Sequence, residues 1–377
     1  MDGSEFNDTF YGAVGDDTIN SAPGSDTFVY SLGDGSDLIN EESDSTVEVD
    51  TLRLTDLLPS DLLLSRVGDD VMIKVLSTGH EIEIDEQFWS TTQNYGIERI
   101  TFADGTIWDR ARINSEAWYR GTIDAETITG SSFNDTIYGA AGDDILNGGV
   151  GSDAYIYASG DGNDQIDEST GAAAQIDALR FTNLNPADIS LTHVGVDLMI
   201  DVASTGARIE IDQHFSSTTQ NFGIERFEFA DGTVWDHAKI NSETWYRGTN
   251  SGQTITGSAF NDNIDGAGGN DTIGGNAGHD QLVGGAGNDT LTGGAGNDAF
   301  VFRAGFGVDT VQDFKDTATE NDIVEFSTSV FADYAAAYAA SAQVGADVVI
   351  TFDASNSVKL KNTTLTNLDT DDFRFVS

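Results

Sequence analysis

Aspartate recurs every nine residues in three parts of this 377-residue sequence. The pattern is plainest in residues 284–301, GGAGNDTLTGGAGNDAFV, where glycines precede each aspartate and an apolar residue follows it. Carboxylates bind hard cations, and glycine permits the positive φ angles of a tight loop, which leave carbonyl oxygens pointing to one side. We therefore expect each repeat to form a cation-binding loop. The aspartates in this register are Asp8, Asp17, Asp26, Asp135, Asp144, Asp153, Asp262, Asp271, Asp280, Asp289 and Asp298.

The last three residues of each repeat are long enough for a short β-strand, and the middle one is always apolar. If successive repeats stack as parallel strands about 4.7 Å apart, the aspartates form a column in which neighbours repel by about 3 kcal/mol at an effective dielectric near 20. Calcium prefers carboxylate and carbonyl oxygens in a flexible cage, whereas magnesium needs a tighter octahedron and soft metals need thiolate or imidazole. The repeats therefore predict several bound Ca²⁺ ions.

A longer repeat of 127 residues organises the chain into two full units, 3–129 and 130–256, and a third that begins alike and then diverges. The stretches between the nonapeptides alternate apolar and polar residues, and FADGT at 102–106 has Asp-Gly at a hairpin bend. We expect strands there with a small core of their own, and a short helix in WDRARINSEAWY and in WDHAKINSETWY. Beyond Asp313, residues 326–343 are a candidate amphipathic helix, and residues 347–352 and 357–362 alternate as strands.

Composition excludes several classes of function. Seventeen Lys and Arg stand against 64 Asp and Glu, giving a formal net charge of -47. Nucleic acid is a poor partner for so acidic a chain, and cations are favoured ones. There is no cysteine, which excludes disulfides, thiolate metal sites and a cysteine nucleophile. No apolar run approaches the length of a membrane span.

No common catalytic motif occurs in the sequence. The motifs H-E-x-x-H, the P-loop and G-x-S-x-G are all missing. None of the five histidines has a histidine at the matching position of the other 127-residue unit. Carboxylates do recur in both units and could in principle serve a glycosidase, but solvated strand faces and turns explain them more simply. We therefore predict that the chain is not an enzyme.

Tryptophans offer a possible surface for sugars. Trp108 recurs as Trp235, whereas Trp89 has Ser216 as its counterpart and is the better candidate for an exposed ring. Core packing of the small β modules is the simpler explanation for the recurring pair. Possible glycan contacts are Trp89, Trp108 and Trp235.

The nonapeptide resembles the G-G-x-G-x-D-x-U-x repeat of the RTX (repeats-in-toxin) proteins, which form a calcium-binding parallel β-roll. The resemblance implies that each calcium lies between loops two repeats apart, for example between Asp280 and Asp298. The stretches between the rolls resemble the haemolysin-type calcium-binding-related domain, and the C-terminal LDTDDFRFVS resembles the signal of type I secretion substrates. The metal-binding residues implied are Asp17, Asp26, Asp37, Asp135, Asp144, Asp153, Asp164, Asp262, Asp271, Asp280, Asp289, Asp298 and Asp309, with Gly142, Gly151, Gly269, Gly278, Gly287 and Gly296.

Together these patterns predict an all-β fold in which calcium-binding parallel β-rolls alternate with small β-rich modules, with a minor helix near the C-terminus. The function predicted is that of a secreted protein that folds on calcium binding outside the cell and serves as a scaffold or adhesive module. Two alternatives stay open, namely the C-terminal export and folding part of a larger enzyme or toxin, and a calcium-dependent polysaccharide-binding module. Expected partners are calcium, the type I secretion machinery and a polysaccharide or cell surface. The predicted parts are roll 1 (1–46), module 1 (47–120), roll 2 (121–173), module 2 (174–247), roll 3 (248–312) and a C-terminal cap and secretion signal (313–377).

Overall fold

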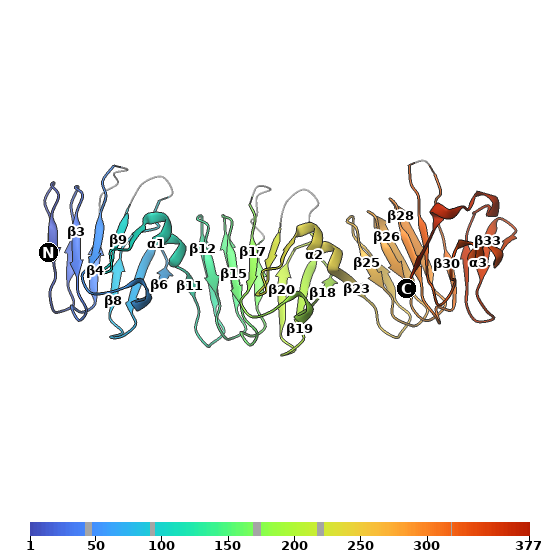
Figure 1. The fold of residues 1–377 in the computed structure, drawn as a ribbon, viewed down its shortest axis with the longest axis horizontal. Coiled ribbons are helices and arrows are strands. Elements are labelled where there is room, and N and C mark those ends of the chain that lie inside the picture. Colours follow the sequence, from blue (N-terminus) through green and yellow to red (C-terminus); the bar gives the residue numbers. More distant parts are fainter. Residues whose placement is uncertain (42–46, 91–94, 169–174, 217–221, 318) are drawn as a thin grey trace. The chain divides into compact units, whose positions relative to one another are not determined.

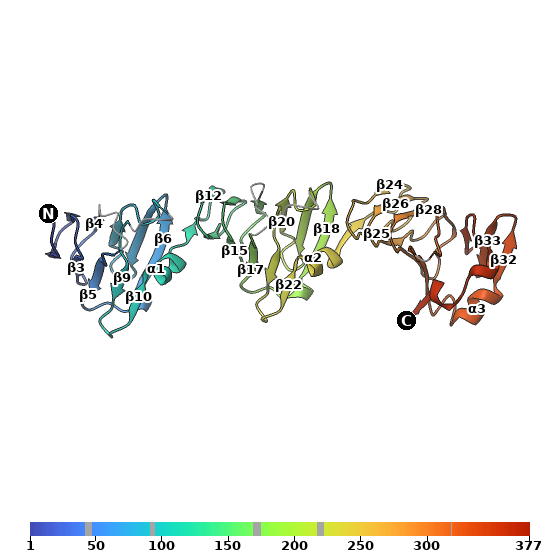
Figure 2. The same ribbon diagram turned by 90° about the horizontal axis from the view of Figure 1, so that it is seen from above.

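A computed structural model describes residues 1–41, 47–90, 95–168, 175–216, 222–317 and 319–377. The chain forms two compact units, one of residues 1–184 with 228–232 and the other of residues 185–227 with 233–377. Strands dominate both units, as Figures 1 and 2 show. The all-β prediction is therefore confirmed. Among the described residues, no helix is long and apolar enough to cross a membrane.

Roll 1 places its short strands alternately in two sheets. β1 pairs in parallel with β3, and β2 pairs in parallel with β4, so that one coil holds two repeats. The apolar residue of each repeat points into the coil, where Phe10 stacks on Phe28 with ring centroids 5.4 Å apart. The strands are β1 (Thr9–Tyr11), β2 (Thr18–Asn20), β3 (Thr27–Tyr30) and β4 (Asp37–Asn40).

Module 1 continues the coil of roll 1. β5 and β9 extend the first sheet in parallel beyond β3, and β8 extends the second sheet beyond β4. The antiparallel strands β7, β6 and β10 follow, and the expected hairpin at FADGT joins β9 to β10. The elements are β5 (Thr51–Leu54), η1 (Pro59–Asp61), β6 (Leu62–Val67), β7 (Asp70–Val75), β8 (Glu81–Ile84), β9 (Arg99–Thr101), β10 (Ile107–Asp109) and α1 (Arg110–Glu116).

The prediction that this module has a separate core is wrong. Phe10, Ile19 and Phe28 of roll 1 belong to the same hydrophobic cluster as Leu52 and Ile73 of module 1. Because the module's first strands add to the edges of both roll sheets, their inward side chains enclose one continuous core. The roll is thus supported at one end by apolar packing that the nonapeptides do not supply.

Roll 2 repeats the two-sheet arrangement. β11, β13, β15 and β17 pair in parallel in one sheet, and β12, β14 and β16 pair in parallel in the other. A bridge between Ser65 and Trp118 joins β6 of module 1 to the start of this roll. The strands are β11 (Tyr119–Arg120), β12 (Thr127–Ser131), β13 (Thr136–Tyr138), β14 (Ile145–Gly149), β15 (Ala154–Tyr157), β16 (Gln165–Asp167) and β17 (Ala178–Phe181).

The second unit contains the antiparallel strands β20, β19 and β18, which lead through β23 into the parallel strands of roll 3. A second sheet runs from β24 through β26, β28 and β30. The elements up to the end of the nonapeptides are η2 (Pro186–Asp188), β18 (Ile189–Val194), β19 (Asp197–Val202), β20 (Arg208–Asp212), β21 (Arg226–Glu228), β22 (Val234–Asp236), α2 (His237–Glu243), β23 (Thr244–Arg247), β24 (Thr254–Thr256), β25 (Asn263–Asp265), β26 (Thr272–Ala277), β27 (Gln281–Val283), β28 (Thr290–Ala295), β29 (Ala299–Phe302) and β30 (Val308–Val311).

The C-terminal region closes roll 3 with further strands. β34 pairs with β30, and β31 and β35 extend the other sheet. The helix expected over 326–343 is much shorter, because Asp333 caps its start through Ala336 N–H (2.9 Å) and residues 341–344 pair with β33 instead. The elements are β31 (Ile323–Ser327), α3 (Tyr334–Ala339), β32 (Ser341–Val344), β33 (Asp347–Thr351), β34 (Ser357–Leu360), η3 (Leu365–Asn367), η4 (Thr370–Asp372) and β35 (Phe373–Val376).

Candidate calcium sites

The aspartates of the repeats stand in columns along each roll, and all of them except Asp8 and Asp17 are buried. In roll 3, Oδ1 of Asp280 accepts the backbone N–H of Asp262 (2.8 Å), and Oδ1 of Asp298 accepts that of Asp280 (2.9 Å). The same bond joins Asp271 to Asp289 and Asp289 to Asp309. Every aspartate in these pairs is buried. The structure thus brings together the residues that the sequence pairs two repeats apart.

Rolls 1 and 2 contain the same ladder. The backbone N–H of Asp135 donates to Asp153 Oδ1 (2.7 Å). The corresponding bonds of the other predicted pairs join Asp144 to Asp164 (3.1 Å) and Asp17 to Asp37 (3.0 Å).

The second oxygen of most of these carboxylates has no partner. Within the described part of the chain, Oδ2 of eight buried aspartates accepts no hydrogen bond. A buried acceptor without a partner costs about 1–3 kcal/mol, and more when it is charged. Burial accordingly raises the pKa of Asp280 to about 7 and that of Asp309 to about 8. The eight are Asp26, Asp144, Asp153, Asp271, Asp280, Asp289, Asp298 and Asp309.

The first aspartate of each roll differs, because a serine satisfies it. Asp135 Oδ2 accepts the backbone N–H of Ser131 (2.7 Å) and its hydroxyl (2.9 Å), and Asp135 also forms a buried ion pair with Arg66. Ser258 donates in the same way to Asp262. These two predicted ligands therefore already have protein partners on both carboxylate oxygens.

The residue at the second position of the repeat distinguishes the serine-capped aspartates from those with an unpartnered oxygen. Where it is serine, as at Ser131 and Ser258, its side chain caps the aspartate of the same repeat. Where it is alanine in the left-handed region, as at Ala140 (φ 66°) and Ala267 (φ 64°), the aspartate keeps an unpartnered oxygen. Such a backbone conformation costs a non-glycine residue roughly 1–2 kcal/mol. Its presence beside an unpartnered carboxylate is what a ligand-binding loop would show.

Glycines let the coils approach closely. A Cβ on any of the six predicted glycines would lie within 2.7 Å of a backbone atom of the neighbouring coil. Another glycine, at the first position of the repeat, makes room for the carboxylate. A Cβ on Gly266 would lie 2.6 Å from Asp271 Oδ2 and 2.6 Å from the carbonyl oxygen of Gly284, so a carboxylate and a carbonyl oxygen converge there. The six predicted glycines are Gly142, Gly151, Gly269, Gly278, Gly287 and Gly296.

One of the two columns in each roll ends in a longer step beyond the repeats, which the nonapeptide register misses. Oδ1 of Asp177 accepts the backbone N–H of Asp153 (2.7 Å), and Oδ1 of Asp50 accepts that of Asp26 (2.7 Å). In roll 3, Asp322 accepts from Asp298 (3.0 Å). These steps span 24 residues rather than 18. The sequence signal that could have identified these aspartates is that Asp50 and Asp177 stand 127 residues apart, at equivalent positions of the two long repeats.

The family comparisons agree with this geometry. The RTX calcium-binding nonapeptide repeat matches residues 1–28, 120–155, 247–282 and 274–311. The haemolysin-type calcium binding protein related domain matches residues 70–112 and 197–239. The chain is an RTX calcium-binding protein. Its columns of carboxylate and carbonyl oxygens fit a hard divalent cation, and calcium is the ion that this family's repeat binds.

Two solved structures are similar to parts of the RTX protein. The extracellular lipase LipA from Serratia marcescens is 20% identical over 69% of this chain, with a TM-score of 0.28, and the chain covers 42% of the lipase. The AlgE6R3 subunit of the Azotobacter vinelandii mannuronan C5-epimerase is 30% identical over 33% of this chain and 80% of that one, with a TM-score of 0.28. No curated protein matches the chain.

Buried histidines of the RTX protein serve packing. The His193 ring lies between the rings of Phe215 and Tyr246, with centroids 3.8 and 3.9 Å away. Burial lowers the pKa of His193 to about 4 and that of His214 to about 3, so both are neutral at physiological pH. Arg66 and Gln87 occupy the equivalent positions in the first 127-residue repeat.

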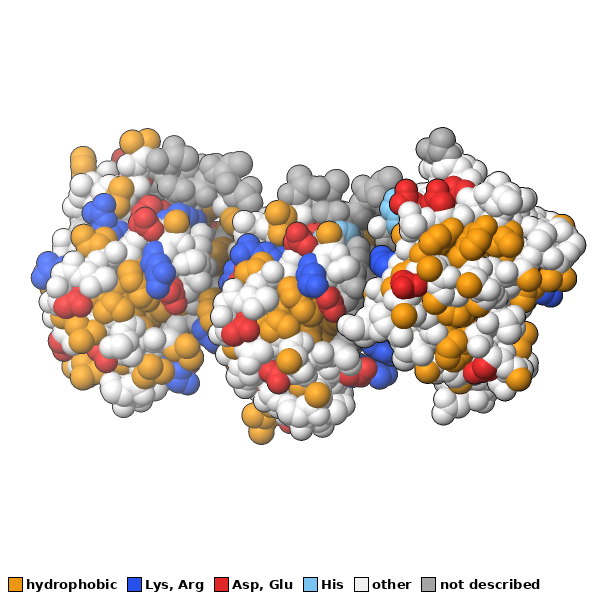
Figure 3. Space-filling model, turned by 45° about the vertical axis from the view of Figure 1, so that its right-hand side comes forward, with side chains coloured by type: hydrophobic (Ala, Val, Ile, Leu, Met, Phe, Trp, Pro, Cys, Tyr) orange, Lys and Arg blue, Asp and Glu red, His pale blue; other side chains and the backbone are white. Residues whose placement is uncertain are grey.

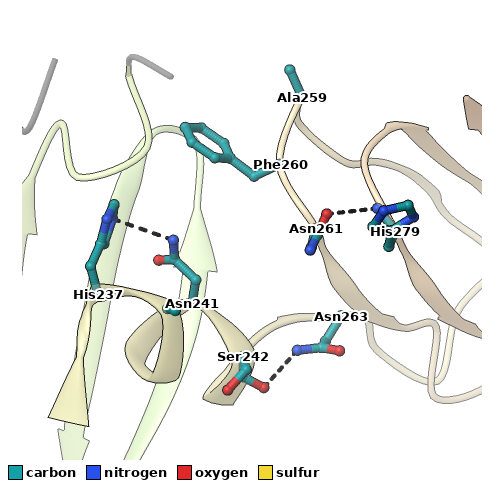
Figure 4. A pocket seen from close by; sticks show the side chains of 9 residues that line it. His237, Asn241, Ser242, Ala259, Phe260, Asn261, Asn263 and His279 are labelled. Atoms are coloured by element: carbon teal, nitrogen blue, oxygen red, sulfur yellow. Dashed lines mark hydrogen bonds between the residues drawn. The ribbon is translucent and has the colours of Figure 1, made fainter. Parts of the chain in front are cut away.

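A cleft of about 660 Å³ separates α2 from the first loops of roll 3 (Figure 4). His237 and His279 lie on opposite sides of it, and each is held by protein atoms. His237 Nε2 pairs with the Asn241 amide (3.3 Å), and His279 Nδ1 accepts the backbone N–H of Asn297 (2.8 Å). In another repeat the same position holds Asn270, whose side-chain oxygen accepts the backbone N–H of Asn288 in the next coil. His279 thus replaces an asparagine.

The predicted tryptophans have different surroundings. Trp89 is 61% exposed. Trp108 is half-buried against Phe102, with ring centroids 4.9 Å apart. Trp235 lines a cleft of about 380 Å³ together with Trp245. On the face drawn in Figure 3, acidic side chains lie among uncharged and basic ones.

Proposed function

We propose that this RTX protein is secreted and that calcium drives folding of its rolls outside the cell. The observation that carries the proposal is the set of eight buried aspartate oxygens without a partner. A bare column of such oxygens opposes folding, and a divalent cation removes the opposition.

Linkage gives the size of the effect. Extracellular calcium modules bind with dissociation constants of about 0.1 to 1 mM. One site of about 0.1 mM affinity adds roughly 1.4 kcal/mol of stability at about 1 mM calcium. Several such sites stabilise thin-cored coils that are unstable without the ion. In a low-calcium cytosol the chain stays extended enough for export, and folding follows outside.

The folding part of the proposal is tested by the hydrodynamic radius of the whole chain in chelator and in calcium. We expect an expanded chain in chelator that becomes compact on addition of calcium and not of magnesium. A compact chain in chelator at neutral pH would contradict the proposal. Export by a type I system is tested separately, by expressing the chain in a bacterial host with and without such an exporter and assaying the medium.

We further propose that the protein serves as a scaffold or adhesive module. We propose that the chain does not itself catalyse a reaction, which is supported by the neutral, packed state of His193 and His214. That it forms the export and folding part of a larger secreted enzyme or toxin is the alternative. An active domain encoded next to it in the full-length protein would favour that alternative.

Polysaccharide binding is the second candidate function, favoured by the cleft at Trp235 and Trp245. Glu243 and Arg247 line the same cleft beside the two indole rings. Aromatic faces flanked by polar groups suit sugars, because the ring packs on apolar C–H faces and the polar groups bind hydroxyls.

Affinity electrophoresis through neutral and acidic polysaccharides, in calcium, tests this function. We expect Trp235→Ala and Trp245→Ala to lose retardation. Trp89→Ala removes an exposed ring outside this cleft and tests that other predicted contact separately. Equal retardation of all four proteins would contradict a glycan site in this cleft.

A further inference from the structure

Three carboxylates converge where roll 2 ends. Asp153, Glu168 and Asp177 each offer a ligand oxygen, and these oxygens all lie within 4.8 Å of one another. All three residues are only 1% exposed. Among the residues that the structure describes, this is the one group of three such side chains. Only Asp153 belongs to the nonapeptides.

The three side chains are positioned by the roll itself. Asp153 Oδ1 accepts the backbone N–H of Asp135 (2.7 Å), and Asp177 Oδ1 accepts that of Asp153 (2.7 Å). Glu168 follows β16 and accepts the hydroxyl hydrogen of Tyr155 on Oε1. Asp153 Oδ2 has no hydrogen-bond partner among the described residues. A buried, unpartnered oxygen therefore faces two further carboxylates.

Gly148 leaves space at the point of convergence. A Cβ on this residue would lie within 2.7 Å of Asp153 Oδ2, Glu168 Oε1 and Tyr155 Oη. Three oxygen atoms thus surround a position that only glycine keeps clear. Three buried carboxylates without nitrogen or sulfur ligands are the donor set of a hard divalent cation.

We propose that Asp153, Glu168 and Asp177 bind a Ca²⁺ ion of their own, in addition to ions held between the repeat loops. The ion fastens the last coil of roll 2 to the segment that leaves it. The inference rests on the proposed function only in that both need calcium binding. It adds Glu168 and Asp177 to the ligands that the repeat supplies.

The other rolls differ at this position in informative ways. In roll 1 the equivalent acids are Asp26, Glu41 and Asp50, but Ser21 stands in place of Gly148 and Phe28 in place of Tyr155. In roll 3 the residue that corresponds to Glu168 is Asp313, because it follows Asp298 by 15 residues as Glu168 follows Asp153. Both oxygens of Asp313 already have partners: they accept the backbone N–H groups of Gly293 and Gly294 (2.9 Å each). Among the described residues, three acids converge in this way only in roll 2. Ser21 shows that a side chain is accommodated at the glycine position.

The test counts calcium ions bound by the whole chain in equilibrium dialysis at saturating calcium. Glu168→Gln keeps the size of the side chain and an acceptor for Tyr155 but removes the charge, and should bind one ion fewer than the wild type. Gly148→Ala keeps every carboxylate and fills the space, and should also bind one ion fewer. Tyr155→Phe, the residue found in roll 1, should leave the count unchanged.

Terbium, which replaces calcium and is excited through a nearby aromatic ring, gives a second readout. Tyr155→Phe should lower the tyrosine-sensitised terbium emission although the ion count is unchanged. If Glu168→Gln fails to fold in calcium, as circular dichroism would show, Gly148→Ala and the terbium comparison decide.

Unchanged ion counts in Glu168→Gln and Gly148→Ala would overturn the site, and so would equal terbium emission from the wild type and Tyr155→Phe. Failure of the wild type to bind any calcium is a different result, which would refute the proposed function itself.

Discussion

Mild acid should stabilise the calcium-free rolls rather than denature them. Burial, together with the charges of neighbouring aspartates, raises the pKa of Asp280 to about 7 and that of Asp309 to about 8. In the unfolded chain these carboxyl groups have a pKa of about 3.9. The folded state therefore binds more protons than the unfolded state between about pH 4 and pH 7. Its free energy of unfolding falls as the pH rises through that window and recovers as the pH falls.

The expected size is large for a marginally stable protein. One such carboxyl group contributes about 1.4 kcal/mol per pH unit inside the window, or roughly 3 kcal/mol between pH 7 and pH 5. Carboxylates in one column titrate together, so their contributions do not simply add. Two histidines oppose the gain. Burial lowers the pKa of His193 to about 4 and that of His214 to about 3, so each costs about 2 kcal/mol at pH 5 relative to an ordinary pKa of about 6.5.

Far-UV circular dichroism in chelator at pH 5, 6 and 7 measures the effect, with a urea titration at each pH at which the chain is folded. We expect the most stable protein at pH 5, and a larger gain in His214→Gln, which introduces the residue found in the first unit. Light scattering checks for aggregation, because the pI is about 4.1. With saturating calcium the order should reverse, since protons compete with the metal for the carboxylates. Equal or lower stability at pH 5 in both proteins without calcium would refute the reasoning.

Four further substitutions test three separate parts of the structure. Asp280→Asn should raise the calcium concentration needed for folding, whereas Asp262→Asn, at a serine-capped position, should not. A calcium titration of both variants compares them. Equal shifts in the two variants would contradict the distinction between capped and open aspartates. Gly287→Ala should destabilise roll 3 by more than about 2 kcal/mol in a denaturant titration, because φ is 149° and the Cβ would overlap the neighbouring coil. Arg66→Met should cost about 3–5 kcal/mol by leaving the Asp135 carboxylate buried without its cation, and calorimetry showing an unchanged melting temperature would argue against that ion pair.

Much of the fold followed from the sequence, because the nine-residue period places one apolar side chain and one aspartate at the same point of every coil. The pairing of Asp262 with Asp280 is a direct consequence of that period. The strands of module 1 were also predictable from alternation. That they share a core with Phe28 was not, because alternation shows which face is apolar and not which surface covers it.

Beyond the nonapeptides, the sequence predicted only the aspartates of the glycine-rich segments that continue each roll, as at Asp37 and Asp164. Asp177 and Glu168 lie outside the nonapeptide register, and only the fold brings them beside Asp153. The distinction between capped and open aspartates depends on the backbone at Ala140 and on the hydroxyl of Ser131, which spacing alone does not reveal. The helix over 326–343 failed as a prediction because pairing of residues 341–344 with β33 outweighs the helix propensity of an alanine-rich run.

Calcium-dependent folding is tested most directly by far-UV circular dichroism of the whole chain during a calcium titration from chelator at neutral pH, with magnesium as the control. A cooperative gain of β-structure with calcium, and none with magnesium at the same concentrations, is the expected result. A spectrum with full β-structure in chelator that calcium leaves unchanged would contradict the claim that the ion drives folding of the rolls.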